Sequence, residues 1–209
     1  MKKLIINADD FGMSKVFNEK ILELLENGFI KSTTVMVNRI TKEQNDHLKR
    51  LIGMYKIVSI GLHLEFNIEE QIEMKIKDQY QKFISIFKFP PSHFDVHKLI
   101  NSKEVIMKVN KAVEEYNLPV RNHGIKARVK QTSYPAFMPI NFDINEIIGF
   151  FKNMKDNKSY ELITHPGEYD QNCNSSLNER RIIEYKNIIK LQDYIKSHKN
   201  IRNISYLEL

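Results

Sequence analysis

Short apolar runs alternate along this chain with longer stretches in which apolar residues recur every three or four positions. The longer stretches have the period of amphipathic helices, and the short runs have the length of strands. Such alternation is typical of β/α units around a mostly parallel sheet. The pattern predicts strands at residues 4–8, 33–37, 58–64, 93–97, 118–121, 161–164 and 204–207. It predicts helices at residues 15–27, 41–54, 102–116, 145–154 and 177–197.

Two stretches fall outside this list. Residues 122–142 predict a long loop, because Pro135 and Pro139 interrupt any regular element. Residues 65–89 are charged and helical in character. The 209 residues, 42% of them hydrophobic, are enough for one core, and we expect residues 1–209 to form a single domain. About seven strands fit either a closed or nearly closed barrel or an open doubly wound sheet.

Charge and composition limit the kinds of partner that we expect for this chain. The net charge of +6 suggests nucleic acid, but the lysines are scattered and form no dense block, so we expect a solvated surface instead. No stretch is long enough to span a membrane, and the apolar run near the start ends at Asn7, too early for a signal peptide. The single cysteine, Cys173, cannot form an internal disulfide. We therefore expect a cytoplasmic protein with no nucleic-acid or membrane partner.

Polar side chains gather where the predicted strands end. Asp9 and Asp10 follow the first strand, His63 lies near the end of the third, His97 ends the fourth, and His165 follows the sixth. Both candidate architectures place catalysis at the carboxyl ends of their strands. These carboxylates and imidazoles are therefore expected to converge at one mouth of the sheet.

Each of these residues also has an ordinary structural interpretation. Adjacent aspartates after a strand commonly form a turn, and Ser14 could cap the helix that follows. A lone histidine in a strand is more often a hydrogen-bonded, half-buried residue than a metal ligand. His47, His123 and His198 lie in helical or loop contexts, and we expect them at the surface. The functional interpretation gains weight because several such residues coincide at strand ends.

An aspartate and two histidines with open coordination positions are a standard set for a hydrolytic metal. Such a metal polarises a carbonyl and lowers the pKa of a bound water. A nearby carboxylate can then act as base and an imidazole as acid. No GxSxG, HExxH, Walker or Rossmann fingerprint competes with this set in the sequence. The residues thus favour metal-assisted hydrolysis of an amide or ester.

The motifs themselves resemble those of a known family. NADDFG at residues 7–12 and GLHL at residues 61–64 resemble the opening half of YdjC-type carbohydrate deacetylases, also called chitooligosaccharide deacetylases. PSHFDVH at residues 91–97 is similar to the family's proline-Thr-His-x-Asp-Ser-His segment. LPVR at residues 118–121 and HPG at residues 165–167 follow in the expected order, so the resemblance covers nearly the whole chain.

The resemblance implies an irregular (β/α) barrel related to the polysaccharide deacetylases. It implies a divalent metal, usually magnesium with zinc as the alternative, and a small carbohydrate substrate such as an N-acetylated amino sugar or a short chitooligosaccharide. A homodimer is also an expectation from the family. By motif match, Asp10, His63 and His97 would be the metal ligands, Asp9 the base, His165 the acid, and Arg121 an orienting partner for a catalytic carboxylate.

The sequence departs from the family pattern in two places and leaves rival functions open. Residues 98–101 stand where the family has further histidines, and residues 65–89 are shorter than the family norm. One rival is a metal-dependent phosphoesterase or other amidohydrolase with the same ligands; the other is a non-catalytic sugar-binding descendant. A sugar site needs apolar or aromatic walls, which Tyr134, Phe137 and Met138 could supply unless they only anchor the loop.

Overall fold

The computed structural model describes residues 1–55, 57–67, 71–98 and 102–209. Within these residues, six strands pair in parallel in the order β4-β3-β2-β1-β5, with β6 also paired to β1. The strands are β1 (Lys2–Phe11), β2 (Ser32–Val35), β3 (Ser59–Leu64), β4 (Phe94–Val96), β5 (Ser159–Thr164) and β6 (Ile201–Ile204). The helices are α1 (Lys15–Glu26), α2 (Lys42–Met54), α3 (Ile72–Phe87), α4 (Lys103–Glu114), α5 (Ile144–Asn153) and α6 (Arg181–Ser197). Two short 3₁₀ helices are η1 (Asn178–Arg180) and η2 (Tyr206–Glu208).

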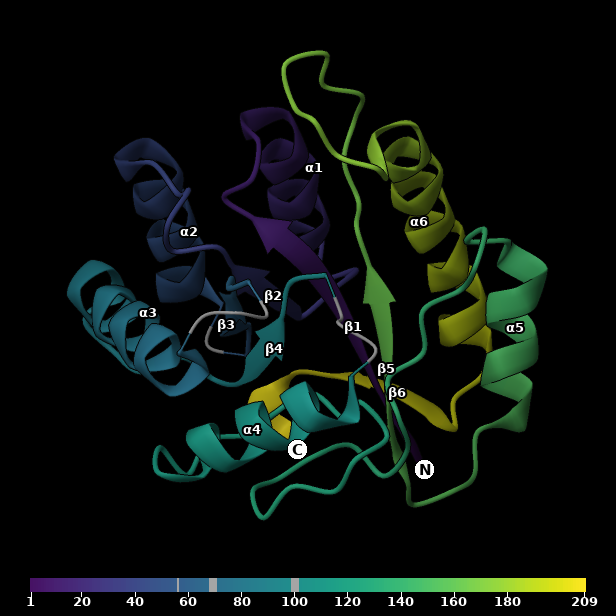
Figure 1. Ribbon diagram of the computed structural model, residues 1–209. Helices are drawn as coiled ribbons and strands as arrows, with labels where there is room; N and C mark the ends of the chain where they lie inside the picture. The colour runs from purple at the N-terminus through teal and green to yellow at the C-terminus, as the bar shows by residue number, and fades with distance from the viewer. Residues whose placement is uncertain (56, 68–70, 99–101) are drawn as a thin grey trace.

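The sheet curls because β1 pairs with two strands along one of its edges. Along one edge of β1, β5 pairs with residues 3–8. On the other edge, β6 pairs with residues 2–5 and β2 with residues 7–11. The helices surround the strands (Figure 1). The expected irregular β/α barrel is therefore confirmed, in a half-closed form.

Most predicted elements lie within a few residues of the observed ones, and three differ. Residues 65–89, for which the sequence indicates helical character without bounds, contain the helix α3. The predicted strand at 118–121 is reduced to one bridge, between Phe94 and Val120. The predicted strand at 204–207 was wrong: the last strand ends at Ile204, because Ser205 and Glu208 form a capping box that starts η2.

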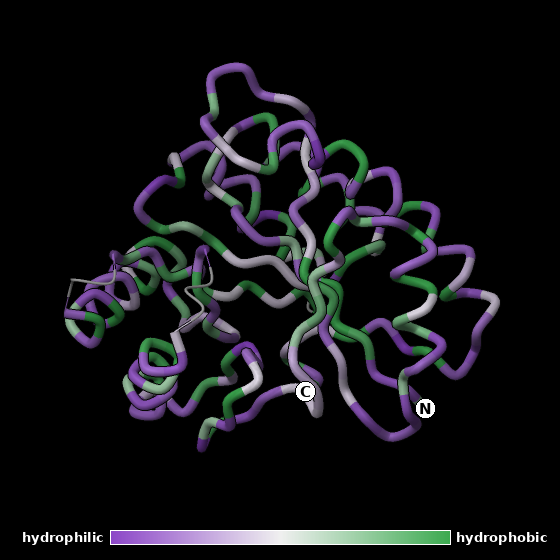
Figure 2. The backbone as a smooth tube through the Cα atoms, turned by 45° about the vertical axis from the view of Figure 1, so that its right-hand side comes forward, coloured by the Kyte–Doolittle hydropathy of each residue, from purple (hydrophilic) through white to green (hydrophobic). Residues whose placement is uncertain are grey.

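Alternation along the strands separates an apolar face from a polar one. Leu4, Ile6 and Ala8 of β1 belong to the main hydrophobic core, whereas Asn7 and Asp9 belong to the opposite face. Hydrophobic segments are concentrated in the middle of the molecule (Figure 2). The polar face of the sheet includes the buried residues Asn7, Ser32, Thr34, Ser59, His63, Asp95 and Glu161. Hydrogen bonds connect several of them, such as those from Thr34 to Asp95 and from Ser32 to Asn7, so the barrel interior is a polar network.

A bulge at the end of β1 places two neighbouring aspartates on this polar face. Ala8 pairs with Thr33 and Phe11 with Val35, so β1 has one residue more than β2 between these pairs. The backbone of Asp10 is left-handed, with φ of 68°. In a regular strand, consecutive side chains point to opposite faces, and a bulge can re-aim one of them. Aspartate adopts this conformation more readily than most residues do.

At the other end of the barrel, the buried ring of His93 packs between Gly61 and Tyr206. The rings of His93 and Tyr206 stack at 3.6 Å between centroids. A Cβ atom at Gly61 would lie 2.4 Å from Cε1 of His93, so a side chain at this position would collide with the ring. Burial lowers the pKa of His93 from 6.5 to about 3.

This burial predicts a specific acid sensitivity. Below pH 6.5 the unfolded chain binds a proton at His93 that the folded chain does not, so the free energy of unfolding falls as the pH drops toward 3. At pH 5 this loss is about 2 kcal/mol. The substitution His93→Phe removes it, so urea denaturation at pH 7 and pH 5 should show a smaller difference in the variant than in the wild type. The exposed His47→Gln variant is the control; a His93→Phe variant with wild-type acid sensitivity would contradict this assignment.

No helix in the described ranges is both long and apolar enough to cross a membrane.

Candidate metal and catalytic site

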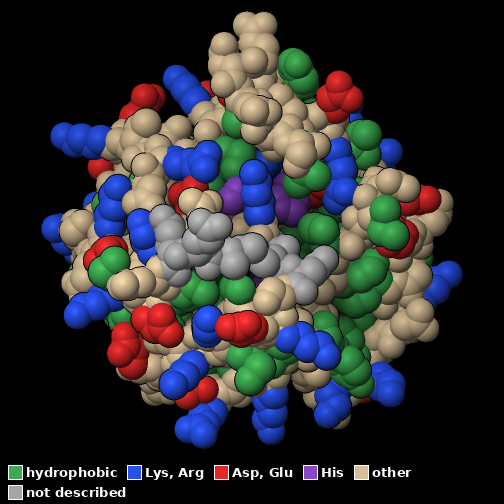
Figure 3. Space-filling model, viewed as in Figure 1, with side chains coloured by type: hydrophobic (Ala, Val, Ile, Leu, Met, Phe, Trp, Pro, Cys, Tyr) green, Lys and Arg blue, Asp and Glu red, His purple; other side chains and the backbone are tan. Residues whose placement is uncertain are grey.

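A cavity of about 450 Å³ opens at the carboxyl ends of the strands. Histidine side chains are visible in the middle of this face, with lysine and arginine side chains beside them (Figure 3). The volume is in the range of sites for small ligands. The structure places all the sequence-predicted site residues on the wall of this cavity: Asp9, Asp10, His63, His97, Arg121 and His165.

Three of these residues could hold a metal ion. Oδ1 of Asp10 lies 3.1 Å from Nε2 of His63 and 3.1 Å from Nδ1 of His97, and the two imidazole nitrogens are 3.2 Å apart. Ligand atoms at about 2.1 Å from one metal ion are separated by about 3.0 to 3.4 Å in octahedral or tetrahedral geometry. The three donors therefore already have the spacing of one coordination sphere.

Asp95, for which the sequence indicated no role, orients His63. Its carboxylate is hydrogen-bonded to Nδ1 of His63, which leaves Nε2 as the atom facing Asp10. A carboxylate behind a ligating imidazole is a common arrangement in metal sites. Burial would lower the pKa of His63, but the charge of Asp95 and hydrogen bonds with Asp10 and Asp95 raise it well above its usual range. A metal ion binding here would therefore have to displace a proton.

Asp9 is held by Arg121 and is not one of these three donors. Nη1 of Arg121 donates to Oδ2 of Asp9 at 2.8 Å, and Nη2 donates to Oδ1 at 2.7 Å. The same guanidinium binds Asp95 at 2.8 Å and Glu161 at 2.9 Å. Asp9, His63 and Asp95 form a second group of close donors, and Arg121 already bridges its two carboxylates. The arginine neutralises part of the negative charge of these carboxylates, and its bidentate contact fixes the orientation of Asp9.

His165 lies between the carboxylates of Asp9 and Glu184. Its Nε2 is 3.8 Å from Oδ2 of Asp9, and its Nδ1 is 3.8 Å from Oε2 of Glu184. Burial would lower the pKa of His165, but the Glu184 carboxylate, with help from Asp10 and Asp9, raises it. The imidazole is therefore biased toward its protonated form at the cavity wall.

Arg181, which the sequence did not indicate, holds the second oxygen of Asp10. Its Nη2 donates to Oδ2 of Asp10 at 2.6 Å, and the guanidinium lies 3.9 Å above the ring of Phe17. Gly167 leaves room for this packing, because a Cβ there would lie 2.9 Å from the Phe17 ring. With Oδ2 engaged by the arginine, Oδ1 of Asp10 is the atom directed at the two histidines.

The loop at residues 122–142 contributes differently from expectation. His123 was expected at the surface, and this was wrong: it lines the cavity, and its Nε2 is buried with no hydrogen-bond partner among the described residues. Met138 also lines the cavity. Tyr134 and Phe137 anchor the loop instead, because their rings stack on Tyr160 and Phe150, respectively.

The sequence of this chain is similar to a known protein family and to several carbohydrate deacetylases. A family described as "YdjC-like protein" matches residues 3–70 and 67–192. A carbohydrate deacetylase from Clostridium beijerinckii is 29% identical over 83% of this chain and 85% of its own length. Carbohydrate deacetylase 2 from Listeria innocua is 27% identical, over 99% of this chain and 98% of its own length. The similarity to these relatives thus extends over most or all of the chain.

Solved structures share the fold. An Enterococcus faecalis protein, whose suggested role is cellobiose-phosphate cleavage, matches with a TM-score of 0.77 and 20% identity, over 99% of this chain and 98% of that one. A family 4 acetyl xylan esterase from Clostridium thermocellum, in complex with a cobalt ion, matches with a TM-score of 0.60 and 13% identity, over 99% and 89%.

Proposed function

Since this chain belongs to the YdjC-like family, we propose that it is a metal-dependent carbohydrate deacetylase, organised as a single domain, that removes acetyl groups from N-acetylated amino sugars or short chitooligosaccharides. The observation that carries the proposal is the placement of Asp9 and His165 beside the trio of Asp10, His63 and His97, in one cavity. Amide hydrolysis needs an activated water, a base and an acid, and these residue types provide them.

The residue roles follow from the contacts. A divalent ion held by Asp10, His63 and His97 would polarise the acetyl carbonyl and acidify the attacking water. Asp9 accepts the proton that the water gives up, while Arg121 keeps the carboxylate turned toward the cavity. His165 donates its proton to the amine nitrogen as the C–N bond breaks, because an amine anion is too basic to leave unprotonated.

The donor set bears on the choice of metal. The family resemblance favours magnesium, whereas two imidazole donors are a set that zinc prefers. Oδ2 of Asp10 is engaged by Arg181, so this aspartate would bind through one oxygen. Isothermal titration of the metal-free protein with magnesium and with zinc would show which ion binds more tightly.

One assay separates this function from its rivals. The metal-loaded protein should release acetate from N,N′-diacetylchitobiose and leave p-nitrophenyl phosphate intact. Release of phosphate without acetate would support a phosphoesterase. Metal binding with neither product would support a sugar-binding descendant without catalysis.

The Glu184→Gln substitution is expected to shift the pH dependence of kcat/KM. The charge of Glu184 helps to raise the pKa of His165 against the opposing effect of burial. Without that charge, His165 loses its proton at a lower pH, so the alkaline limb of kcat/KM should move to lower pH by about one unit. The exposed Glu179→Gln variant is the matched control. An unchanged alkaline limb in Glu184→Gln would exclude His165 as the group that defines it.

A further inference from the structure

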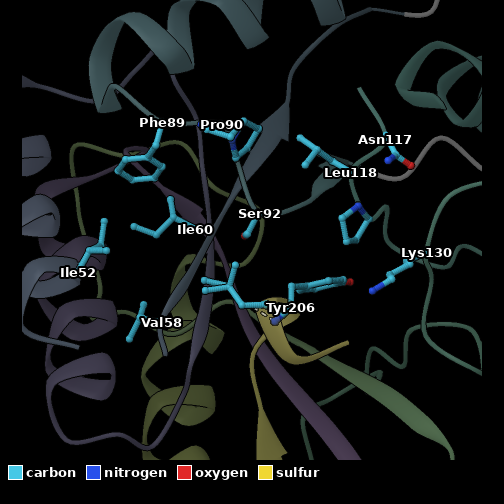
Figure 4. Close-up of a pocket in the computed structure, with 14 residues that line it drawn as sticks. Ile52, Val58, Ile60, Phe89, Pro90, Ser92, Asn117, Leu118, Lys130 and Tyr206 are labelled. Atoms are coloured by element: carbon cyan, nitrogen blue, oxygen red, sulfur yellow. Dashed lines mark hydrogen bonds between the residues drawn. The ribbon is translucent and has the colours of Figure 1, made fainter. Parts of the chain in front are cut away.

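The side chain of Tyr206 connects the end of the chain to the catalytic side of the barrel. Tyr206 begins η2, just after the last strand, and is 2% exposed. One face of its ring stacks on His93. The residue also borders a second cavity, of about 590 Å³, lined mainly by apolar residues at the amino ends of the strands (Figure 4). It does not line the catalytic cavity, which lies at the opposite end of the sheet.

Three consecutive contacts lead from Tyr206 to Asp9. The hydroxyl of Tyr206 donates to Oε2 of Glu161 at 2.5 Å. Nε of Arg121 donates to Oε1 of the same carboxylate at 2.9 Å, and its two terminal nitrogens bind Asp9. Each of these four residues is nearly or fully buried. A displacement at one end therefore cannot be absorbed by solvent.

The charges around Arg121 explain why the hydroxyl matters. One guanidinium serves three carboxylates, those of Asp9, Asp95 and Glu161. Tyr206 supplies the donor for the Glu161 oxygen that Arg121 does not bind. Without it, this oxygen would be a buried acceptor with no donor, which is costly. Glu161 would then turn toward Arg121 or take up a proton, and either change redistributes the bonds that Arg121 makes to Asp9.

We propose that Tyr206 is a positioning residue for the deacetylation reaction: its hydroxyl fixes Glu161, and Glu161 fixes the guanidinium of Arg121 against Asp9. This inference rests on the proposed function, because Asp9 is the base in that reaction. Tyr206 touches neither the catalytic cavity nor the candidate metal ligands. Its removal should therefore affect turnover and leave substrate and metal binding unchanged.

The test compares two tyrosine hydroxyls that each bind a glutamate. Tyr206→Phe keeps the stacked ring and removes only the hydroxyl; we expect kcat to fall about tenfold with KM and the metal Kd unchanged, since small misplacements of catalytic groups are costly. Tyr185→Phe is the matched control, because the Tyr185 hydroxyl donates to Glu23, outside the site. Its kcat should remain that of the wild type.

A double-mutant cycle and a crystal structure complete the test. If Tyr206 acts through Glu161, the losses in kcat of Tyr206→Phe and Glu161→Gln should not multiply in the double variant. The crystal structure of Tyr206→Phe should show the Arg121 guanidinium shifted relative to Asp9. Wild-type kcat in Tyr206→Phe, or losses that multiply, would overturn the positioning role. A wild-type protein without deacetylase activity would instead overturn the proposed function, and the crystal structure would still report on the contacts.

Discussion

Replacing Asp9 by asparagine is expected to lower kcat for deacetylation about 100-fold or more and to leave metal binding largely intact. The reason is that both oxygens of Asp9 are bound by Arg121, whereas the candidate metal donors are Asp10, His63 and His97. Asparagine retains one acceptor for the arginine but cannot take up a proton as a base. The measurements are steady-state kinetics on N,N′-diacetylchitobiose and isothermal titration of the metal.

Asp10→Asn is the matched control for this experiment. The two residues are adjacent in the sequence and similarly buried, so both variants remove one carboxylate charge from the same place. Asp10→Asn should weaken metal affinity, because Oδ1 of Asp10 lies within 3.1 Å of both histidine donors. Equal loss of metal affinity in the two variants would show that the division of labour between the aspartates is wrong.

His165→Ala should have the other large effect, and that effect should depend on the leaving group. The amine of an N-acetylated sugar needs a proton to depart, whereas the phenolate of p-nitrophenyl acetate leaves unaided. We expect kcat for the sugar to fall by about 100-fold or more, and the rate with p-nitrophenyl acetate by less than about tenfold. Both rates are measured at equal metal occupancy.

The ratio of these two losses carries the information. If His165 only supported the structure or the metal, both substrates would be affected alike, since both need the same polarised carbonyl. Equal losses would therefore remove the acid from this mechanism. The raised pKa of His165, which Glu184 sustains against the effect of burial, agrees with a group that is protonated before it acts.

The sequence predicted those parts of the site that follow from strand periodicity. In a parallel sheet, polar residues at the ends of several strands must lie near one another, whatever the details of the fold. This reasoning identified Asp9, Asp10, His63, His97 and His165, which all line one cavity. The alternation of strands and helices limited the fold to a barrel or an open doubly wound sheet, and the family resemblance favoured the barrel.

Other parts of the site have no such signal. Arg181 and Glu184 are fully buried charges at the start of α6, a helix whose pattern predicted only an amphipathic surface element. His123 lies in a loop without periodicity, so nothing in the sequence placed it on the cavity wall. The last strand was predicted at residues 204–207 and not at 201–204, because Arg202 and Asn203 make the apolar pattern of the observed strand weak. For Arg181, Glu184 and His123, tertiary contacts and not local propensity decide the position.

Because β1 contains a bulge, the number of residues in this strand matters for the site as much as their identity does. The extra residue between Ala8 and Phe11 brings both carboxylates to one face. Deleting Ala8 would restore regular pairing with β2 and keep both aspartates in the chain. Asp9 would then take the place of Ala8 and point into the apolar layer beneath the helices, where a charge is expensive. Insertions and deletions should be tolerated in the surface loops of this protein but not in residues 8–11, even where every side-chain type is kept.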